Sequence, residues 1–337
     1  MCAQAVLRTV MAAIVSVAAI TIANAAEVTL RLGTAVFESH PAHDGAVKFR
    51  DNVRRLTNGA VEVQIFPARQ LGDIKELVEG VQFGTVDISI TTSSAVADLA
   101  PGVEALQLPW LIDSYSHLAR LAQTPEAVAL TAPLEKYGVI CLAILEGGEH
   151  HFLSNRKIAT VDDFKGLKTR VFPVRLHLDV WRAIGVNPTP MAYGAIYSAL
   201  ETRTLDAVDI NISSIFAEKY YEVAKKVTMT GQFFWPEVLL INKKRLEGLK
   251  PEYQAAIKQA AKEAIEPQIM AAEASEVKDR EELVKLGVTF DEVSPAMKAE
   301  MRKAVQPIYQ TYTAKDPLIP PFVAAAERLR LTSKAGQ

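Results

Sequence analysis

The sequence predicts an α/β fold divided into two lobes. The chain has 337 residues, which is too long for most single compact cores. Strand-like and helix-like patterns alternate from about residue 27, and the same alternation begins again after residue 150. Such alternation favours right-handed βαβ units and a mainly parallel sheet in each lobe.

The first 26 residues form a segment of different character. Arg8 is their only charged residue, residues 10–22 are apolar or small, and Ala-Asn-Ala follows at 23–25. This pattern indicates a secretory signal peptide cleaved near Ala25 or Ala26. The apolar run is shorter than the ~20 residues that span a bilayer. We therefore expect a mature periplasmic chain that is not embedded in the membrane; the alternative is a retained anchor or an N-terminal helix.

The composition excludes some partners. The net charge is -2, which does not favour a nucleic-acid partner. After cleavage Cys141 is the one remaining cysteine, so no internal disulfide is expected. Its apolar neighbours predict that it is a small buried side chain.

The first lobe opens with Val28, Leu30 and Leu32, which alternate with polar residues as in a strand. Apolar stripes, alternation and Gly or Pro stops predict the elements after it: a helix over 42–56, a strand over 61–65, a helix over 74–82 and a buried strand over 86–90.

In the second lobe, Thr160 and Asp163 have the spacing of a capping box, with Thr160 at the N-cap. Further elements are predicted in order: a strand over 167–171, a helix over 174–184, a helix over 193–201 and a strand over 207–210.

Residues 251–286 are rich in helix formers, and Pro251 suits a first helical position. Pro267 is expected to bend or split the run. At 1.5 Å per residue the run would reach roughly 50 Å, enough to brace both lobes. The alternative is two ordinary surface helices that meet at Pro267.

The chain lacks the usual motifs of catalysis and of cofactor binding. There is no GxSxG, HExxH, P-loop, Rossmann fingerprint or CxxC. His150 and His151 are adjacent, so on a strand they point to opposite faces and cannot easily share a metal ion. We predict no catalytic residue, no metal site and no cofactor, and so a binding protein. A periplasmic enzyme on the same scaffold is the rival from another class.

Several stretches resemble the solute-binding proteins of tripartite ATP-independent periplasmic (TRAP) transporters, the dicarboxylate-binding-protein (DctP) family. They occur in family order: FPARQLG at 66–72, GVQFGTVD at 80–87, LPWL at 108–111, DDFKGLKTRV at 162–171, PMAYGAIYSALETRTLD at 190–206 and KYYEV at 219–223. The resemblance implies a type II-like periplasmic-binding-protein fold with hinge strands and a long bracing C-terminal helix.

The implied role is capture of a small organic mono- or dicarboxylate by hinge closure, and delivery to integral-membrane permease subunits. The alternative ligands are a sugar acid, an aromatic acid or a polyol. The alternative partner is a sensor. We place lobe I at residues 27–147 and 236–275, and lobe II at residues 148–235 and 276–337.

Arg170 is the central candidate for ligand binding. It lies near the carboxyl end of a predicted strand, where open α/β sheets place ligand clefts. Its guanidinium offers two parallel donors that match a carboxylate. The resemblance implies that this arginine clamps the ligand carboxylate; the alternative is an exposed surface ion pair.

The resemblance implies two further contacts. Tyr193 stands where sialic-acid-binding relatives carry a phenylalanine against the ligand, and Thr92 stands at a pocket-lining position. Their alternatives are helix-face packing and an ordinary loop hydroxyl.

The sequence also departs from the family pattern. His150 occupies the position of a second ligand-binding arginine, and Ile210 occupies that of an asparagine, between Asp209 and Asn211. An apolar residue there suggests a ligand with fewer hydroxyls than a sugar acid, unless the strand shifts and Asn211 takes the role.

Two more residues complete the predicted ligand-binding set. Phe234 belongs to an aromatic run, 233–235, that either lines the cleft or covers the hinge. His40 lies on the first predicted βα loop, where it is able to face the cleft.

Overall fold

The computed structural model describes residues 26–334, so the predicted signal peptide lies almost wholly outside the described residues. Ten strands are present: β1 (Val28–Thr34), β2 (Val61–Phe66), β3 (Ile88–Thr92), β4 (Val139–Ser154), β5 (Lys168–Val171), β6 (Asn187–Pro190), β7 (Ala207–Asn211), β8 (Lys226–Met229), β9 (Phe234–Asn242) and β10 (Thr289–Glu292). The α-helices are α1 (Pro41–Leu56), α2 (Ile74–Phe83), α3 (Tyr115–Leu121), α4 (Pro125–Thr131), α5 (Arg175–Ile184), α6 (Ile196–Glu201), α7 (Ile212–Ala217), α8 (Lys243–Glu247), α9 (Pro251–Lys285), α10 (Pro295–Thr313) and α11 (Ile319–Lys334).

The strands form one extended sheet in the order β2-β1-β3-β9-β4-β7-β5-β6. Strands β1, β2 and β3 are parallel, as are β5, β6 and β7, which confirms the βαβ pattern predicted for each lobe. Between the two groups, β9 and β4 run antiparallel to each other and to their outer neighbours. The sheet is therefore mixed at its centre rather than mainly parallel throughout.

Strand β4 connects the two groups. Its 16 residues pair with β9 over the first part and with β7 and β8 over the last part. The register shifts between Glu146 and Glu149, where Gly147 and Gly148 intervene. Gly148 has φ +126°, a backbone conformation that favours glycine. This bulge marks the point at which β4 passes from one lobe to the other.

Most predicted elements lie within two residues of the observed ones. Thr160 and Asp163 form the predicted capping box, which opens a short 3-10 helix, η4 (Val161–Phe164). The helix predicted over 193–201 is instead a 3-10 turn, η5 (Tyr193–Ala195), that leads into α6. Cys141 is a free cysteine that is only partly buried, because it lies where the β4 pairing is irregular.

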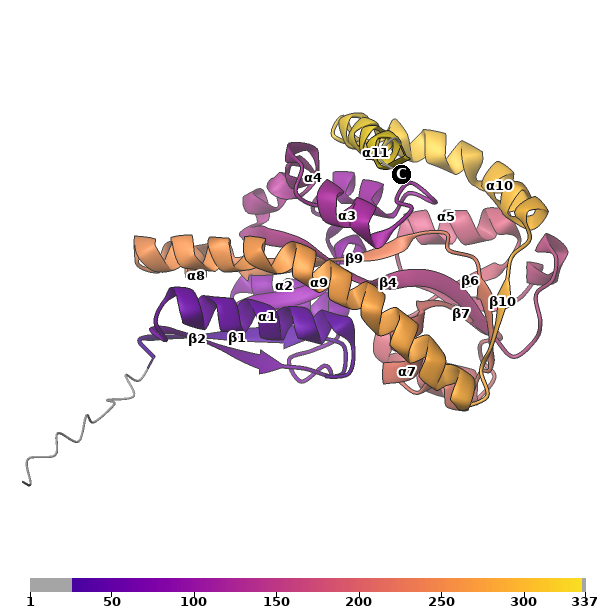
Figure 1. Ribbon diagram of the computed structural model, residues 1–337, viewed down its shortest axis with the longest axis horizontal. Helices are drawn as coiled ribbons and strands as arrows, with labels where there is room; N and C mark the ends of the chain where they lie inside the picture. Colours follow the sequence, from indigo (N-terminus) through magenta and orange to yellow (C-terminus); the bar gives the residue numbers. More distant parts are fainter. Residues whose placement is uncertain (1–25, 335–337) are drawn as a thin grey trace, which may run out of the picture.

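Helix α9 is a single helix of 35 residues that continues through Pro267, so the alternative of two separate helices is wrong. Figure 1 shows its axis changing direction near the middle as it passes from α1 toward α7. Its N-terminal half buries Ile257 and Ala260, and its C-terminal half buries Ala272 and Leu283. Because apolar residues are buried along both halves, packing against the two lobes offsets the ~3 kcal/mol that an internal proline costs. Among residues 26–334, no helix combines the length and hydropathy that a membrane crossing requires.

Candidate functional site

An enclosed cavity lies where the two groups of strands meet. The space inside it is about 20 Å³, room for about one water molecule. Six of the eight predicted ligand-binding residues line it: His40, Thr92, His150, Arg170, Tyr193 and Asn211. Their side chains come from β3, β4, β5 and β7 and from the segments that follow β1 and β6.

Arg170, the third residue of β5, is 1% exposed. Its Nε donates to the carbonyl of Met191 at 3.1 Å, whereas Nη2 has no partner. Burial lowers the pKa of the guanidinium. The alternative of an exposed surface ion pair is therefore wrong. A buried cation with a free donor beside a cavity is a site prepared for an anion, because an unpaired buried charge is costly.

His150 is held from behind by Asp209, and both side chains are fully buried. The His150 Nδ1 lies 3.0 Å from Asp209 Oδ1, which also accepts a hydrogen bond from Gln232 Nε2 at 2.7 Å. Burial lowers the pKa of His150 despite the neighbouring carboxylate. Neutral His150 thus donates from Nδ1 and leaves Nε2, which has no protein partner, as an acceptor. At neutral pH it is not a second cationic clamp.

Asp209 does not line the cavity, so it positions His150 instead of facing the ligand directly. Burial raises its pKa, but the combined interactions with His150, His177 and Trp181 outweigh this effect and lower it.

A hydrogen-bonded group centred on Ser214 forms another wall. Tyr193 Oη donates to Ser214 Oγ at 2.9 Å, and His40 Nε2 lies 3.2 Å from the same oxygen. Asn211 caps α7 by accepting from the Ser214 backbone N–H at 2.7 Å. Ile210 and Asn211 both line the cavity, so the wall is partly apolar and partly amide at this point.

Phe234 does not line the cavity. Its ring packs edge-to-face on Tyr115, with centroids 4.9 Å apart. Successive side chains on a strand face opposite sides, so Trp235 and Glu237 of β9 line the cavity in its place. The Trp235 ring stacks on His150 at 4.2 Å and 9°. Glu237 and the unpartnered hydroxyl of Thr91 were not predicted from the sequence; alternation along β9 would have found Glu237 beside Trp235, whereas alternation along β3 places Thr91 and Thr92 on opposite faces.

Comparison with known proteins decides the family. Residues 32–316 match the model of the bacterial extracellular solute-binding proteins, family 7 (DctP). The chain belongs to this family.

The curated relatives of this family-7 protein include the 2,3-diketo-L-gulonate-binding periplasmic protein of Escherichia coli, which is 32% identical over 252 residues, 74% of this chain and 77% of the relative. The C4-dicarboxylate-binding periplasmic protein of Rhodobacter capsulatus is 26% identical over 90% of this chain and 93% of the relative. Among solved structures, the sugar acid binding protein of Advenella mimigardefordensis, in complex with galactonate, aligns with a TM-score of 0.86 and 27% identity, over 89% of this chain and 98% of that one.

Family-7 proteins are extracytoplasmic binding components of TRAP transporters and not enzymes, so the rival interpretation as an enzyme is wrong. The solved relatives share the two-lobed binding-protein fold, which confirms the predicted fold class. These proteins bind small organic acids and work with a membrane permease.

The rim of the cavity is closed by contacts between the two halves of the family-7 protein. Arg69, in the loop after β2, donates from Nη1 and Nη2 to the two carboxylate oxygens of Glu218, just after α7, at 3.1 Å each. Asp73 accepts from the Gly194 backbone N–H at 2.9 Å. These contacts join the two halves of the protein beside the cavity.

Glu218→Ala is expected to accelerate ligand release about fivefold. The change removes a bidentate, partly buried ion pair, which is worth about 1 kcal/mol. Stopped-flow measurement of the dissociation rate checks this. Asp179→Ala, which breaks ion pairs confined to α5, is the matched control and should leave the rate unchanged. An unaltered release rate in Glu218→Ala would show that the rim contact does not hold the closed form.

His177 makes the stability of the folded protein sensitive to acid. Its Nε2 donates to Gln107 at 2.9 Å, and its ring stacks on Phe233. Burial lowers its pKa to about 3. The folded form keeps this ring neutral, whereas the unfolded chain takes up a proton below pH 6.5, so stability is lost as the pH falls.

Between pH 7 and 5 we expect His177 to reduce the free energy of unfolding by about 2 kcal/mol. Urea unfolding at both pH values measures the loss. In His177→Gln, the difference between the free energies of unfolding at the two pH values should be smaller by that amount. A difference as large as in the wild type would refute the assignment.

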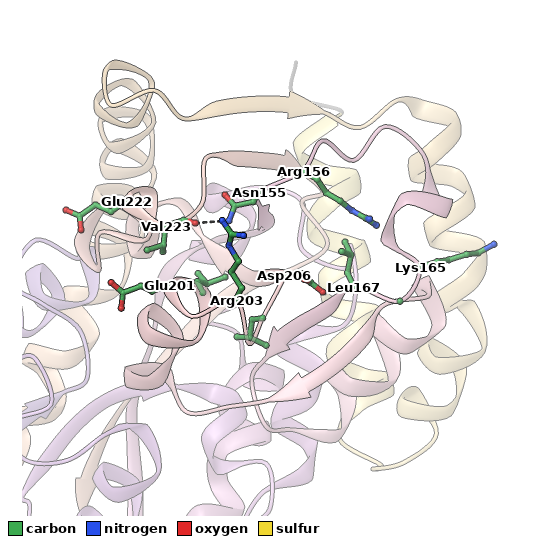
Figure 2. A pocket seen from close by; sticks show the side chains of 12 residues that line it. Asn155, Arg156, Lys165, Leu167, Glu201, Arg203, Asp206, Glu222 and Val223 are labelled. Carbon is green, nitrogen blue, oxygen red and sulfur yellow. Dashed lines mark hydrogen bonds between the residues drawn. The ribbon is translucent and has the colours of Figure 1, made fainter.

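A larger hollow lies elsewhere, on an outer edge of the second lobe (Figure 2), and holds none of the predicted ligand-binding residues. Lys165 pairs with Asp162 at 2.7 Å, and Arg156 donates to the carbonyl of Asp163. Two of its cations are therefore already engaged, and the hollow is open to solvent. It does not compete with the enclosed cavity as a site for an acid.

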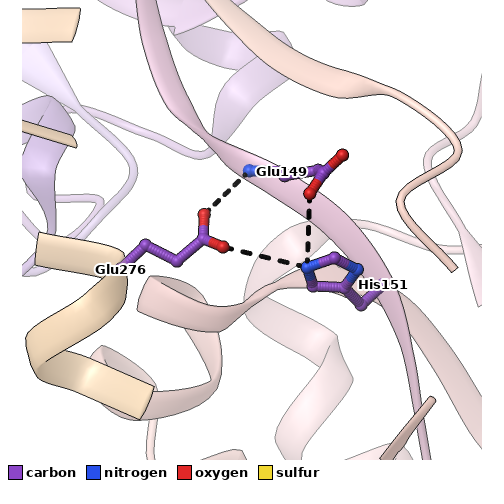
Figure 3. A group of neighbouring side chains, drawn as sticks. All are labelled: Glu149, His151 and Glu276. Carbon is purple, nitrogen blue, oxygen red and sulfur yellow. Dashed lines mark hydrogen bonds and ion pairs between the residues drawn. The ribbon is translucent and has the colours of Figure 1, made fainter. Parts of the chain in front are cut away.

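Glu149, His151 and Glu276 gather on the opposite face of β4, between this strand and α9 (Figure 3). As predicted, the two adjacent histidines face opposite sides. His151 Nδ1 accepts from the Gly231 backbone N–H at 3.1 Å, so the ring's proton lies on Nε2, 3.8 Å from Glu149 and 3.9 Å from Glu276. That proton occupies the position a metal ion would need. The group is better described as a polar contact between β4 and α9.

Proposed function

We propose that this protein captures a small hydroxylated organic acid, of the sugar-acid class, and delivers it to the permease subunits of a TRAP transporter. The observation that carries the proposal is the buried Arg170, whose free Nη2 adjoins the enclosed cavity. A ligand carboxylate supplies the anion that this guanidinium lacks.

The other unpartnered groups of the cavity support a ligand with hydroxyls. His150 Nε2 and Thr91 Oγ1 have no hydrogen-bond partner, and Glu237 adds a carboxyl group. A ligand that carries hydroxyls satisfies such acceptors, whereas an aliphatic acid leaves them unpaired at a cost of about 1–3 kcal/mol each. The relatives named for diketogulonate and galactonate bind acids of this kind. Ile210 contributes an apolar side chain to the lining beside these polar groups.

Binding is proposed to proceed by hinge closure between lobe I (27–147 and 236–275) and lobe II (148–235 and 276–337). The bulge at Gly147 and Gly148 in β4 lies beside Pro236 of β9, the partner of Glu146, and these strands are the proposed hinge. The ligand shifts the population from open to closed by bridging the lobes.

A thermal-shift screen tests the ligand class. Aldonates and uronates should raise the melting temperature by several degrees at millimolar concentration, because a ligand that binds only the folded form stabilises it. C4-dicarboxylates, aromatic acids and neutral polyols form the comparison sets. Stabilisation by polyols without a carboxylate, and not by the acids, would refute the proposal. Uptake of the acid by vesicles holding the permease distinguishes a transporter from a sensor partner.

A further inference from the structure

Glu237 lines the cavity but takes no part in the proposed contact between Arg170 and the ligand carboxylate. It lies on β9, opposite Thr92 of β3 on one side and Leu145 of β4 on the other. Its side chain is 4% exposed and lines the same cavity as Arg170. A Cβ at Gly147 would lie 3.1 Å from Glu237 Oε1, so the glycine of the hinge strand leaves room for this carboxyl group.

No described residue forms a hydrogen bond or an ion pair with the Glu237 carboxyl group. Burial alone raises its pKa to about 8, so no cation offsets the cost of its charge. Three strand spacings separate β9 from β5 in the sheet, roughly 14 Å at about 4.8 Å each. Glu237 and Arg170 therefore line different parts of the cavity.

We propose that Glu237 is the specificity-determining residue for the end of the ligand remote from Arg170, where it accepts a hydroxyl-bearing end and rejects a second carboxylate. This inference rests on the proposed function and narrows it to monocarboxylates. A carboxyl group exchanges hydrogen bonds with a hydroxyl group in either protonation state. Two carboxyl groups in one dry site are held together only while they share a proton.

The preference for a hydroxyl-bearing end over a second carboxylate should therefore increase with pH. The other titratable groups that line the cavity are His40, His150, Tyr193 and Arg170. Burial lowers the pKa of His40 to about 4, lowers that of His150 and raises that of Tyr193. Glu146 lies behind the hinge, and its pKa is raised by burial and by the charge of Glu237. Between pH 6.5 and 9, Glu237 is the cavity group that changes charge.

Galactonate and galactarate are a matched pair of probes, because they differ only in a hydroxymethyl or a carboxylate group at the sixth carbon. Calorimetry should show that the wild type binds galactonate at least tenfold more tightly than galactarate at pH 8.5. At pH 6.5 the ratio of the two affinities should be smaller. Glu237→Gln should reduce the preference at pH 8.5 at least fivefold and remove its pH dependence. Glu62→Gln, the same charge change on β2 away from the cavity, should behave as the wild type.

The outcomes separate this inference from the function on which it rests. If both acids bind the wild type equally, or if Glu237→Gln leaves the ratio unchanged, the role of Glu237 is overturned while carboxylate capture stands. If neither acid binds but a carboxylate-free solute does, the proposed function fails and the inference fails with it.

Discussion

Arg170→Ala should reduce the affinity for the acid ligand by about 10²–10⁴-fold. The arginine is expected to form two charge-assisted hydrogen bonds with the ligand carboxylate, worth about 1.5–3 kcal/mol each. Truncation also leaves the ligand's charge buried without a partner. Isothermal titration calorimetry with an acid from the thermal-shift screen measures the loss.

Arg170→Lys is the informative control for this prediction. Lysine keeps the positive charge but cannot form two parallel hydrogen bonds, so it should recover only part of the affinity. The ligand-free stability of Arg170→Ala should stay near that of the wild type, because among residues 26–334 the side chain makes one hydrogen bond, from Nε to Met191. Unchanged affinity in the alanine variant would remove Arg170 from the site.

Asp209→Ala should lower the free energy of unfolding by about 3–5 kcal/mol. The substitution deprives His150 and Gln232 of a shared acceptor in fully buried surroundings. Each donor left unpaired in buried surroundings costs about 1–3 kcal/mol, because it can neither pair nor reach water. Urea unfolding at pH 7.5 measures the change.

The matched control is Asp209→Asn, which keeps the shape and one acceptor oxygen and should cost less than half as much. If the free energy of unfolding of Asp209→Ala lies within 1 kcal/mol of the wild-type value, Asp209 does not hold His150 in place, and the orientation of His150 Nε2 as an acceptor loses its structural basis.

The residues that the sequence predicted best are those governed by local rules. Thr160 and Asp163 formed their capping box, and Arg170 emerged near the carboxyl end of a parallel strand, because capping and strand-end position depend on a few neighbouring residues. The alternation of strands and helices predicted the parallel strands in each half of the sheet for the same reason.

Features that depend on long-range pairing were missed. The antiparallel placement of β4 and β9 follows from contacts between residues about 90 positions apart, which no local pattern records. The register of β9 decides that Trp235 and Glu237, and not Phe234, face the cavity. The continuity of α9 through Pro267 depends on burial against both lobes, and propensity alone does not predict it.

A crystal structure of the protein with a stabilising sugar acid tests the central claim most directly. The account predicts the acid inside the enclosed cavity, with both carboxylate oxygens within hydrogen-bond distance of the Arg170 guanidinium and its hydroxyls facing His150 and Glu237. An acid bound elsewhere, or held in the cavity with its carboxylate away from Arg170, would contradict it.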